Sequence, residues 1–240
     1  YIDPLIFKNK IEKIGIPLDG YTTEQINYFR KNITLKEIID ILNGGSTYNP
    51  YIVNITIKEG YNMRKIAKTI EEVTENSYDE VLEKLTDNAY ISKLIEEYWF
   101  LTDDILDSKI YYPLEGYLFP ETYQISSKNS VEEVFKVLLD QTNIVLTKYK
   151  TEIENSKYSI HEIMTLSSII EQEAGNANDR ASVAGVFYNR LNAKWSLGSD
   201  VTTYYGSKID DFSYSLTNKE LKDCTNAYNT RCATKVGLPV

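Results

Sequence analysis

The chain has 240 residues, of which 42% are hydrophobic and 25% are charged, a balance typical of globular proteins. Its formal net charge is −9 and no basic run stands out, so binding to nucleic acid through phosphate neutralisation is not expected. The sequence has no apolar run long enough to cross a bilayer. A single histidine and two cysteines match no zinc pattern, and we expect neither a metal ion nor another cofactor.

The first 50 residues end in a predicted helix. Thr34 and Glu37 have the spacing of a capping box, in which each side chain satisfies a free backbone N–H of the first turn. Apolar residues follow at helical spacing, and Gly44-Gly45 ends the pattern. A similar pattern starts again at Asn62, which indicates either a repeated small α+β unit or the common features of capped helices.

Residues 51–105 form the second predicted segment. Apolar and polar residues alternate over 53–57, which is the period of a half-buried strand. A helix capped by Asn62 follows, with one apolar face. Ser77 and Glu80 then form a second capping box that opens another helical region.

From residue 106 the composition changes. The stretch 111–123 is aromatic, and its prolines and glycine prevent a continuous helix. Residues 131–148 predict a helix. Another helix is expected from Asp179 to Leu191, and the rest, from Trp195 to Val240, predicts loops with short strands.

Cys224 and Cys232 lie close together in the sequence. A small disulfide loop and two unpaired thiols are both compatible with this spacing, and the sequence alone leaves the choice open.

Two glutamates lie on a predicted helix that begins at Ser159, with Glu162 as its capping partner, and ends near Gly175. At 100° per residue, Glu171 and Glu173 fall on opposite flanks of a wide apolar arc. A carboxyl group carried into an apolar wall loses hydration and its pKa rises, as a general acid near neutral pH requires. Both are candidates for partial burial, and spacing does not choose between them.

The alternative is that these glutamates are ordinary solvated side chains of an amphipathic helix. His161 falls on the polar side of the same helix. We expect it to be solvated and not catalytic.

Several stretches, in order along the chain, resemble the YceG-like family of endolytic murein transglycosylases. In the C-terminal half these are residues 166–174, 183–191, 197–202, 227–230 and 237–239. Upstream, residues 114–123 resemble another motif of that family. Residues 55–60, with the helix from Asn62, resemble its LysM-like peptidoglycan-binding module.

The resemblance implies an α+β fold: small LysM-like α+β N-terminal modules, then a mixed α+β catalytic domain with the active-site glutamate on a helix. The boundaries implied are an N-terminal segment 1–50, a LysM-like module 51–105, and a C-terminally truncated catalytic domain 106–240.

The resemblance also implies a catalytic glutamate within residues 171–173. Lytic transglycosylases more widely carry their acid as the glutamate of a Glu-Ser or Glu-Thr pair, and Glu173-Ala174 occupies that place, so Glu173 is the expected general acid and base. Ala174, Gly198 and Val201 depart from the family pattern. Glu171 is expected to contact substrate. Other expected substrate-binding residues, including groups that stabilise charge on the sugar, are Asp200, Thr202, Tyr228, Asn229, Thr230 and Glu115, and Tyr117 and Tyr123 are expected to line the groove.

The implied reaction cleaves the bond from N-acetylmuramic acid to N-acetylglucosamine within glycan strands and leaves 1,6-anhydro ends. Two alternatives remain open. One is a hydrolase with Glu173 as acid and Asp200 or Glu171 as base. The other is a peptidoglycan-binding scaffold without activity.

The chain starts with Tyr1 and is expected to be a fragment of a membrane-tethered protein whose anchor lies outside it. By resemblance, this single-pass protein presents the present region on the extracytoplasmic side. Its partners would be peptidoglycan strands, cell-wall synthases and the elongation machinery.

Overall fold

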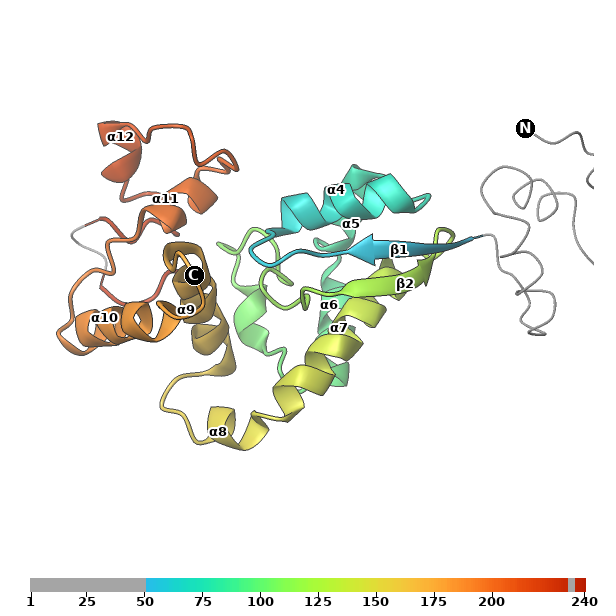
Figure 1. Cartoon of the computed structure of the whole chain (residues 1–240), viewed down its shortest axis with the longest axis horizontal. Coiled ribbons are helices and arrows are strands. Elements are labelled where there is room, and N and C mark those ends of the chain that lie inside the picture. The colour runs from blue at the N-terminus through green and yellow to red at the C-terminus, as the bar shows by residue number, and fades with distance from the viewer. Residues whose placement is uncertain (1–50, 233–235) are drawn as a thin grey trace, which may run out of the picture. The chain divides into compact units, whose positions relative to one another are not determined.

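The computed structural model describes residues 51–232 and 236–240 (Figure 1). This part is rich in helices and contains one two-stranded sheet, which confirms the predicted α+β class. Residues 54–123 and 129–240 form one compact unit. The helix predicted from Thr34, and with it the first half of the possible repeat, lies outside the described residues.

The sheet joins β1 (Ile52–Thr56) to β2 (Thr122–Ser126). The Ile57 N–H donates to the Glu121 carbonyl oxygen at 3.0 Å, and the hydroxyls of Thr56 and Thr122 lie 2.9 Å apart, an antiparallel register. The alternation that predicts a strand over 53–57 is confirmed, because Ile55 and Ile57 are buried while Asn54 and Thr56 are not.

Three helices and a 3₁₀ turn follow β1: α4 (Met63–Val73), α5 (Tyr78–Lys84), α6 (Asn88–Glu97) and η1 (Asp103–Leu106). Asn62 caps α4 by accepting from the Lys65 N–H, and Ser77 with Glu80 forms the predicted capping box of α5. The apolar face of α4 is buried, and α4 packs on α5. These elements therefore follow the sequence pattern closely.

The predicted long helix is α7 (Val131–Thr147), which packs on α5 and is followed by the short α8 (Lys150–Glu154). Between η1 and β2 the chain forms turns around Gly116, which has a φ of 80° that favours glycine. The expected absence of a continuous helix over 111–123 is confirmed.

Helices α9 (Ile160–Glu173) and α10 (Arg180–Asn192) pack against each other (Figure 1). The capping box of Ser159 and Glu162 opens α9 as predicted, and the helix ends at Glu173, just before the predicted stop at Gly175. Their contact is built around a small core of buried side chains, namely Leu166, Ile169, Phe187 and Leu197.

The prediction of short strands after Trp195 is wrong, whereas the predicted loops are confirmed for most of the described residues there. The described residues of this region form two short helices, α11 (Asp200–Gly206) and α12 (Asn218–Leu221), and no strand. Burial of Thr202 and Thr203 stabilises α11 in spite of its β-branched sequence. A capping box of Thr217 and Glu220 opens α12.

Cys224 and Cys232 form a disulfide, which resolves the pairing that the sequence left open. The two cysteines are 8 positions apart in the sequence, and the loop between them carries Tyr228, Asn229 and Thr230. Across residues 51–232 and 236–240, no helix combines the length and the hydrophobicity needed to span a membrane.

Candidate functional site

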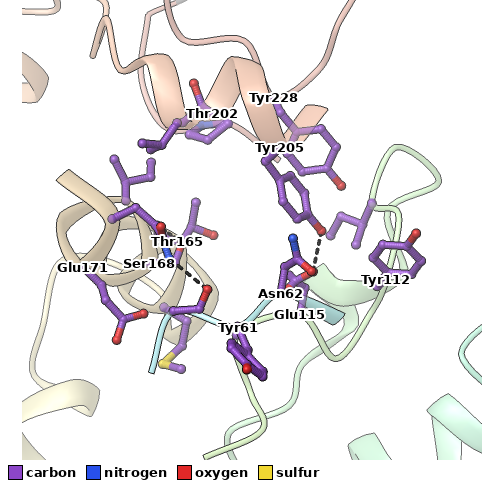
Figure 2. Close-up of a pocket in the computed structure, with 18 of the residues that line it drawn as sticks. Tyr61, Asn62, Tyr112, Glu115, Thr165, Ser168, Glu171, Thr202, Tyr205 and Tyr228 are labelled. Atoms are coloured by element: carbon purple, nitrogen blue, oxygen red, sulfur yellow. Dashed lines mark hydrogen bonds between the residues drawn. The ribbon is translucent and has the colours of Figure 1, made fainter. Parts of the chain in front are cut away.

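A cavity of about 180 Å³ is lined by the start of α4, the aromatic turn before Tyr117, α9 and α11 (Figure 2). Its wall combines aromatic rings with neutral polar groups and carboxylates: Tyr61, Asn62, Tyr112, Glu115, Ser168, Glu171, Thr202, Tyr205 and Tyr228. Aromatic faces beside hydroxyl groups suit a ligand with both apolar and hydroxylated surfaces, such as a sugar.

Glu171 lies in the wall of this cavity and is half-buried. Burial raises the pKa of its carboxyl group above the usual value, while the nearby Arg180 guanidinium opposes the shift. Arg180 also pairs with Glu59 at 3.2 Å, so its charge is shared between two carboxylates. The predicted partial burial is therefore confirmed for Glu171.

Glu173 is the last residue of α9 and is exposed, so its predicted partial burial is wrong. It does not belong to the cavity wall. Its Oε1 accepts a hydrogen bond of 2.5 Å from the hydroxyl of Ser199. The two glutamates therefore have distinct environments: Glu171 is partly desolvated inside the cavity, and Glu173 is open to solvent and bonded to a hydroxyl.

Ser199 is a site residue that the sequence analysis did not single out, although it lies within the stretch 197–202. Its backbone N–H donates to Thr230 Oγ1 at 3.0 Å, and its carbonyl oxygen accepts from Thr202 Oγ1 at 2.8 Å. The hydroxyls of Thr202 and Thr230 are 2.9 Å apart and both residues are buried. Together these bonds fix the backbone that presents the Ser199 hydroxyl to Glu173.

Asn229 and Asp200 bind groups of the protein itself. Asn229 is fully buried, accepts from the Thr203 hydroxyl at 3.0 Å, and donates to three backbone carbonyls between residues 220 and 223. Asp200 forms an ion pair of 2.6 Å with Arg231. In this structure both residues brace the loop after α12 against α11.

Tyr228 presents its ring to the cavity, while its hydroxyl accepts the Tyr111 N–H at 2.7 Å. Burial raises its pKa to about 12, so the phenol stays neutral at physiological pH. Thr202 also lines the cavity. Of the residues expected to bind substrate, the structure thus brings Glu171, Thr202, Tyr228 and Glu115 to one cavity.

Glu115 is held by donors from two distant elements. Its carboxylate accepts from the Met63 N–H at 3.0 and 3.1 Å and from the Tyr205 hydroxyl at 2.8 Å. Burial raises its pKa in spite of these bonds. Tyr117, also at the cavity, is buried, and Tyr123 donates its hydroxyl to the Phe119 carbonyl at 2.6 Å.

His161 is not solvated, contrary to the prediction. It is half-buried at the cavity, with its Nδ1 2.9 Å from the Tyr117 hydroxyl oxygen, and burial lowers its pKa. Its buried Nε2 has no hydrogen-bond partner among the described residues. The turn that contains Tyr117 covers the helix face that periodicity alone assigned to solvent.

Comparison with known proteins identifies relatives over most of the chain. The model of the YceG-like family matches residues 27–240. An endolytic murein transglycosylase of Bacillus subtilis (strain 168) is 38% identical over 182 residues, which cover 75% of this chain and 50% of that protein. An endolytic murein transglycosylase of Streptococcus pneumoniae serotype 2 (strain D39 / NCTC 7466) is 31% identical over 201 residues, which cover 78% of this chain and 36% of that protein. The chain thus spans half or less of the length of these curated relatives.

A solved structure shows the same fold. The crystal structure of a YceG-like protein from Listeria monocytogenes aligns with a TM-score of 0.71 at 27% identity, covering 98% of this chain and 81% of that one.

Proposed function

Since the chain belongs to the YceG-like family, we propose that it is an endolytic lytic transglycosylase acting on peptidoglycan. It cleaves the bond from N-acetylmuramic acid to N-acetylglucosamine within glycan strands. The observation that carries this proposal is the hydrogen bond of Ser199 to Glu173, because it joins the carboxylate at the end of α9 to the loop before α11. Both sides of this bond lie in stretches that resemble the family. The names of the relatives from B. subtilis and S. pneumoniae support the same activity.

Glu173 supplies the proton chemistry in this proposal. As general acid it protonates the oxygen that leaves C1 of the muramic sugar, and the glycosidic C1–O bond breaks. The ionised carboxylate then takes the proton of the muramic 6-hydroxyl, whose oxygen forms the new bond to C1. The products are a 1,6-anhydro end and a free 4-hydroxyl on N-acetylglucosamine, and no water is consumed.

The position of Glu173 suits an enzyme that cuts inside a polymer. A carboxyl group at an exposed helix end can meet a strand that continues in both directions. The Ser199 hydroxyl orients the carboxylate and donates to it when it is ionised.

The cavity lined by α9 and α11 would hold a sugar unit or its substituents. Tyr228 supplies a ring and Glu171 a carboxyl group to it, and Thr202 lines it while its hydroxyl stays bonded to the Ser199 carbonyl oxygen. Four other residues bond to protein groups and so hold the elements around the cavity in place: Asp200, Asn229, Thr230 and Glu115.

Glu171 is the alternative proton donor on α9. Its raised pKa keeps it protonated over a wider pH range, which is the property a general acid needs. A hydrolase would pair the donor with a second carboxylate that activates water. The products distinguish the reactions, because an anhydro end is lighter than a reducing end by one water.

Digestion of purified peptidoglycan tests the proposal. The protein should release products with anhydro ends, as weighed by mass spectrometry, and Glu173→Gln should release none. Reducing ends in their place would show a hydrolase, and no cleavage by the wild type would favour a binding scaffold. Glu171→Gln is the matched variant, two residues away on the same helix.

We also propose that β1 and α4 belong to a LysM-like module that binds glycan. The motif over 55–60, followed by the capped helix α4, supports this assignment. A single membrane anchor outside this chain would place the region at the cell wall. There it would meet the synthases and the elongation machinery.

A further inference from the structure

Tyr205 connects several elements of the cavity wall. It lies on α11, and its hydroxyl donates to Glu115 Oε2 at 2.8 Å (Figure 2). The Arg64 guanidinium lies 5.4 Å from the centre of its ring, and the Tyr228 ring packs edge-on at 4.9 Å. Burial and the neighbouring Glu115 raise the pKa of Tyr205, so it remains a neutral donor.

The partners of Tyr205 are fixed to the start of α4. Glu115 accepts the Met63 N–H with both oxygens. Arg64 donates through Nε to Asp210 at 3.0 Å and forms an ion pair with it of 2.5 Å through a second nitrogen. Arg64 is buried while Asp210 is exposed, so this contact is only partly shielded from solvent. The first turn of α4 thus holds Tyr205 of α11 through Glu115, and it holds the segment after α11 through Asp210.

The other end of α11 reaches the candidate catalytic carboxylate. Ser199 directly precedes the helix and donates to Glu173 at 2.5 Å. A helix of seven residues is about 10 Å long, and α11 joins Tyr205 to Ser199 over that length. A change at Tyr205 is therefore transmitted along α11 to the Ser199 hydroxyl.

We infer that Tyr205 is a positioning residue for catalysis: by anchoring α11 to Glu115, it places the Ser199 hydroxyl on Glu173. This inference rests on the proposed function and adds a residue to its machinery. It assigns Glu115 a role in holding Tyr205 and not in touching glycan. Tyr205 could not be selected from the sequence, because it is one of 20 tyrosines.

The test compares Tyr205→Phe with Tyr98→Phe. Both changes remove only a hydroxyl, and Tyr98 donates to Asp140 at the same distance of 2.8 Å, away from the cavity. Tyr205→Phe should lower kcat about tenfold with KM unchanged, since misplacement of a catalytic group affects the chemical step. Tyr98→Phe should leave both constants unchanged. A rise in KM with unchanged kcat would instead make Tyr205 a glycan contact and overturn the inference.

A double mutant identifies the route of the effect. If Tyr205 acts through Ser199, then Tyr205→Phe should have no further effect in a Ser199→Ala background. Additive losses would overturn the inference. This comparison needs an active wild type, and absence of anhydro products from the wild type would refute the proposed function instead.

Hydrogen exchange tests the placement without any activity. The backbone amides of α11 should exchange faster in Tyr205→Phe than in the wild type, and Tyr98→Phe should leave them unchanged. Equal exchange in all three proteins would overturn the inference. Should Tyr205→Phe fail to fold, Glu115→Ala removes the acceptor of the same hydrogen bond and carries the same expectations.

Discussion

Gln172 donates from its Nε2 to the carbonyl oxygen of Gly60 at 3.1 Å, across 112 residues of sequence. Gly60 has a φ of 73°, and a Cβ atom placed on it would lie 2.8 Å from the same Nε2. The turn before α4 therefore approaches α9 so closely that only glycine fits without displacing the glutamine. This contact also brings the turn over the flank of α9 that carries Glu171.

Replacing Gly60 by alanine tests this approach. Gly60→Ala should destabilise the protein by about 2 kcal/mol, because the backbone is strained and the Gln172 bond is lost. Gly116→Ala is the control, since Gly116 has a φ of 80° but open space around it, and only the strain should appear. In a Gln172→Ala background the two alanine variants should cost equal free energy of unfolding, as measured in urea. A persistent excess for Gly60 would contradict the contact.

The two glutamates of α9 should differ in their effect on cleavage. Glu173→Gln should lower kcat by a factor of at least about 10², the usual contribution of a general acid or base. Glu171→Gln should have a smaller effect, because it removes a cavity contact. Thermal unfolding of both variants provides the control for folding. Equal and complete loss in both would remove the basis for choosing Glu173, and loss in Glu171→Gln alone would make Glu171 the donor.

Stability should depend on pH in opposite ways at Glu171 and Glu80. Burial raises the pKa of Glu171, so its favourable contribution is present below the unfolded value near 4.5 and is lost as pH rises through the folded value. Glu80 has a lowered pKa because it accepts bonds from Ser77, so its contribution is present above that unfolded value and is lost as pH falls through the folded one.

The measurement compares each glutamine variant with the wild type across pH. The wild type should lose stability relative to Glu171→Gln as pH rises above about 4.5. Relative to Glu80→Gln, the wild type should gain stability as pH rises through the range in which Glu80 loses its proton. If both stability differences changed in the same direction with pH, one of the two glutamates would not have the environment described.

The disulfide of Cys224 and Cys232 should support both stability and activity. Its loop carries Thr230, whose hydroxyl accepts the Ser199 N–H. Replacing both cysteines by serine should cost about 2 to 3 kcal/mol of unfolding free energy and reduce cleavage. A thiol reductant should have a similar effect on the wild type. It should have none on the variant, which retains no cysteine.

Local signals in the sequence predicted most of the helices. The capping residues Asn62, Ser77 and Ser159 each mark a helix start that the structure confirms, because the cap satisfies backbone groups within one turn. The capping box of Thr217 and Glu220 was equally visible and marks α12. Strand β2 was missed, since its pairing with β1 depends on residues far away in sequence.

Helix α11 shows where local signals fail. Its sequence of valine, threonines and tyrosines favours a strand. Tertiary contacts decide otherwise, because Thr202 and Thr203 are buried and bonded to Thr230 and Asn229. The spacing of residues within 200–206 gives no indication of these partners, which lie more than 20 residues away in the sequence.

The candidate site was predicted in outline only. Periodicity placed Glu171 and Glu173 on the flanks of an apolar arc but could not say which flank another segment covers. The turn at Gly60 covers the Glu171 side, and the Ser199 hydroxyl meets Glu173. The predicted solvation of His161 is wrong for the same reason. Tyr117, which covers it, lies 44 residues away in the sequence.

Asp210 accepts hydrogen bonds from both Asn62 and Arg64. Chimeras between family members would therefore have to exchange the beginning of α4 together with its carboxylate acceptor near residue 210. A transplanted N-terminal half that arrived without this acceptor would leave a guanidinium enclosed among tyrosines with no counter-ion. Such hybrids should fold poorly, however well each half is preserved by itself.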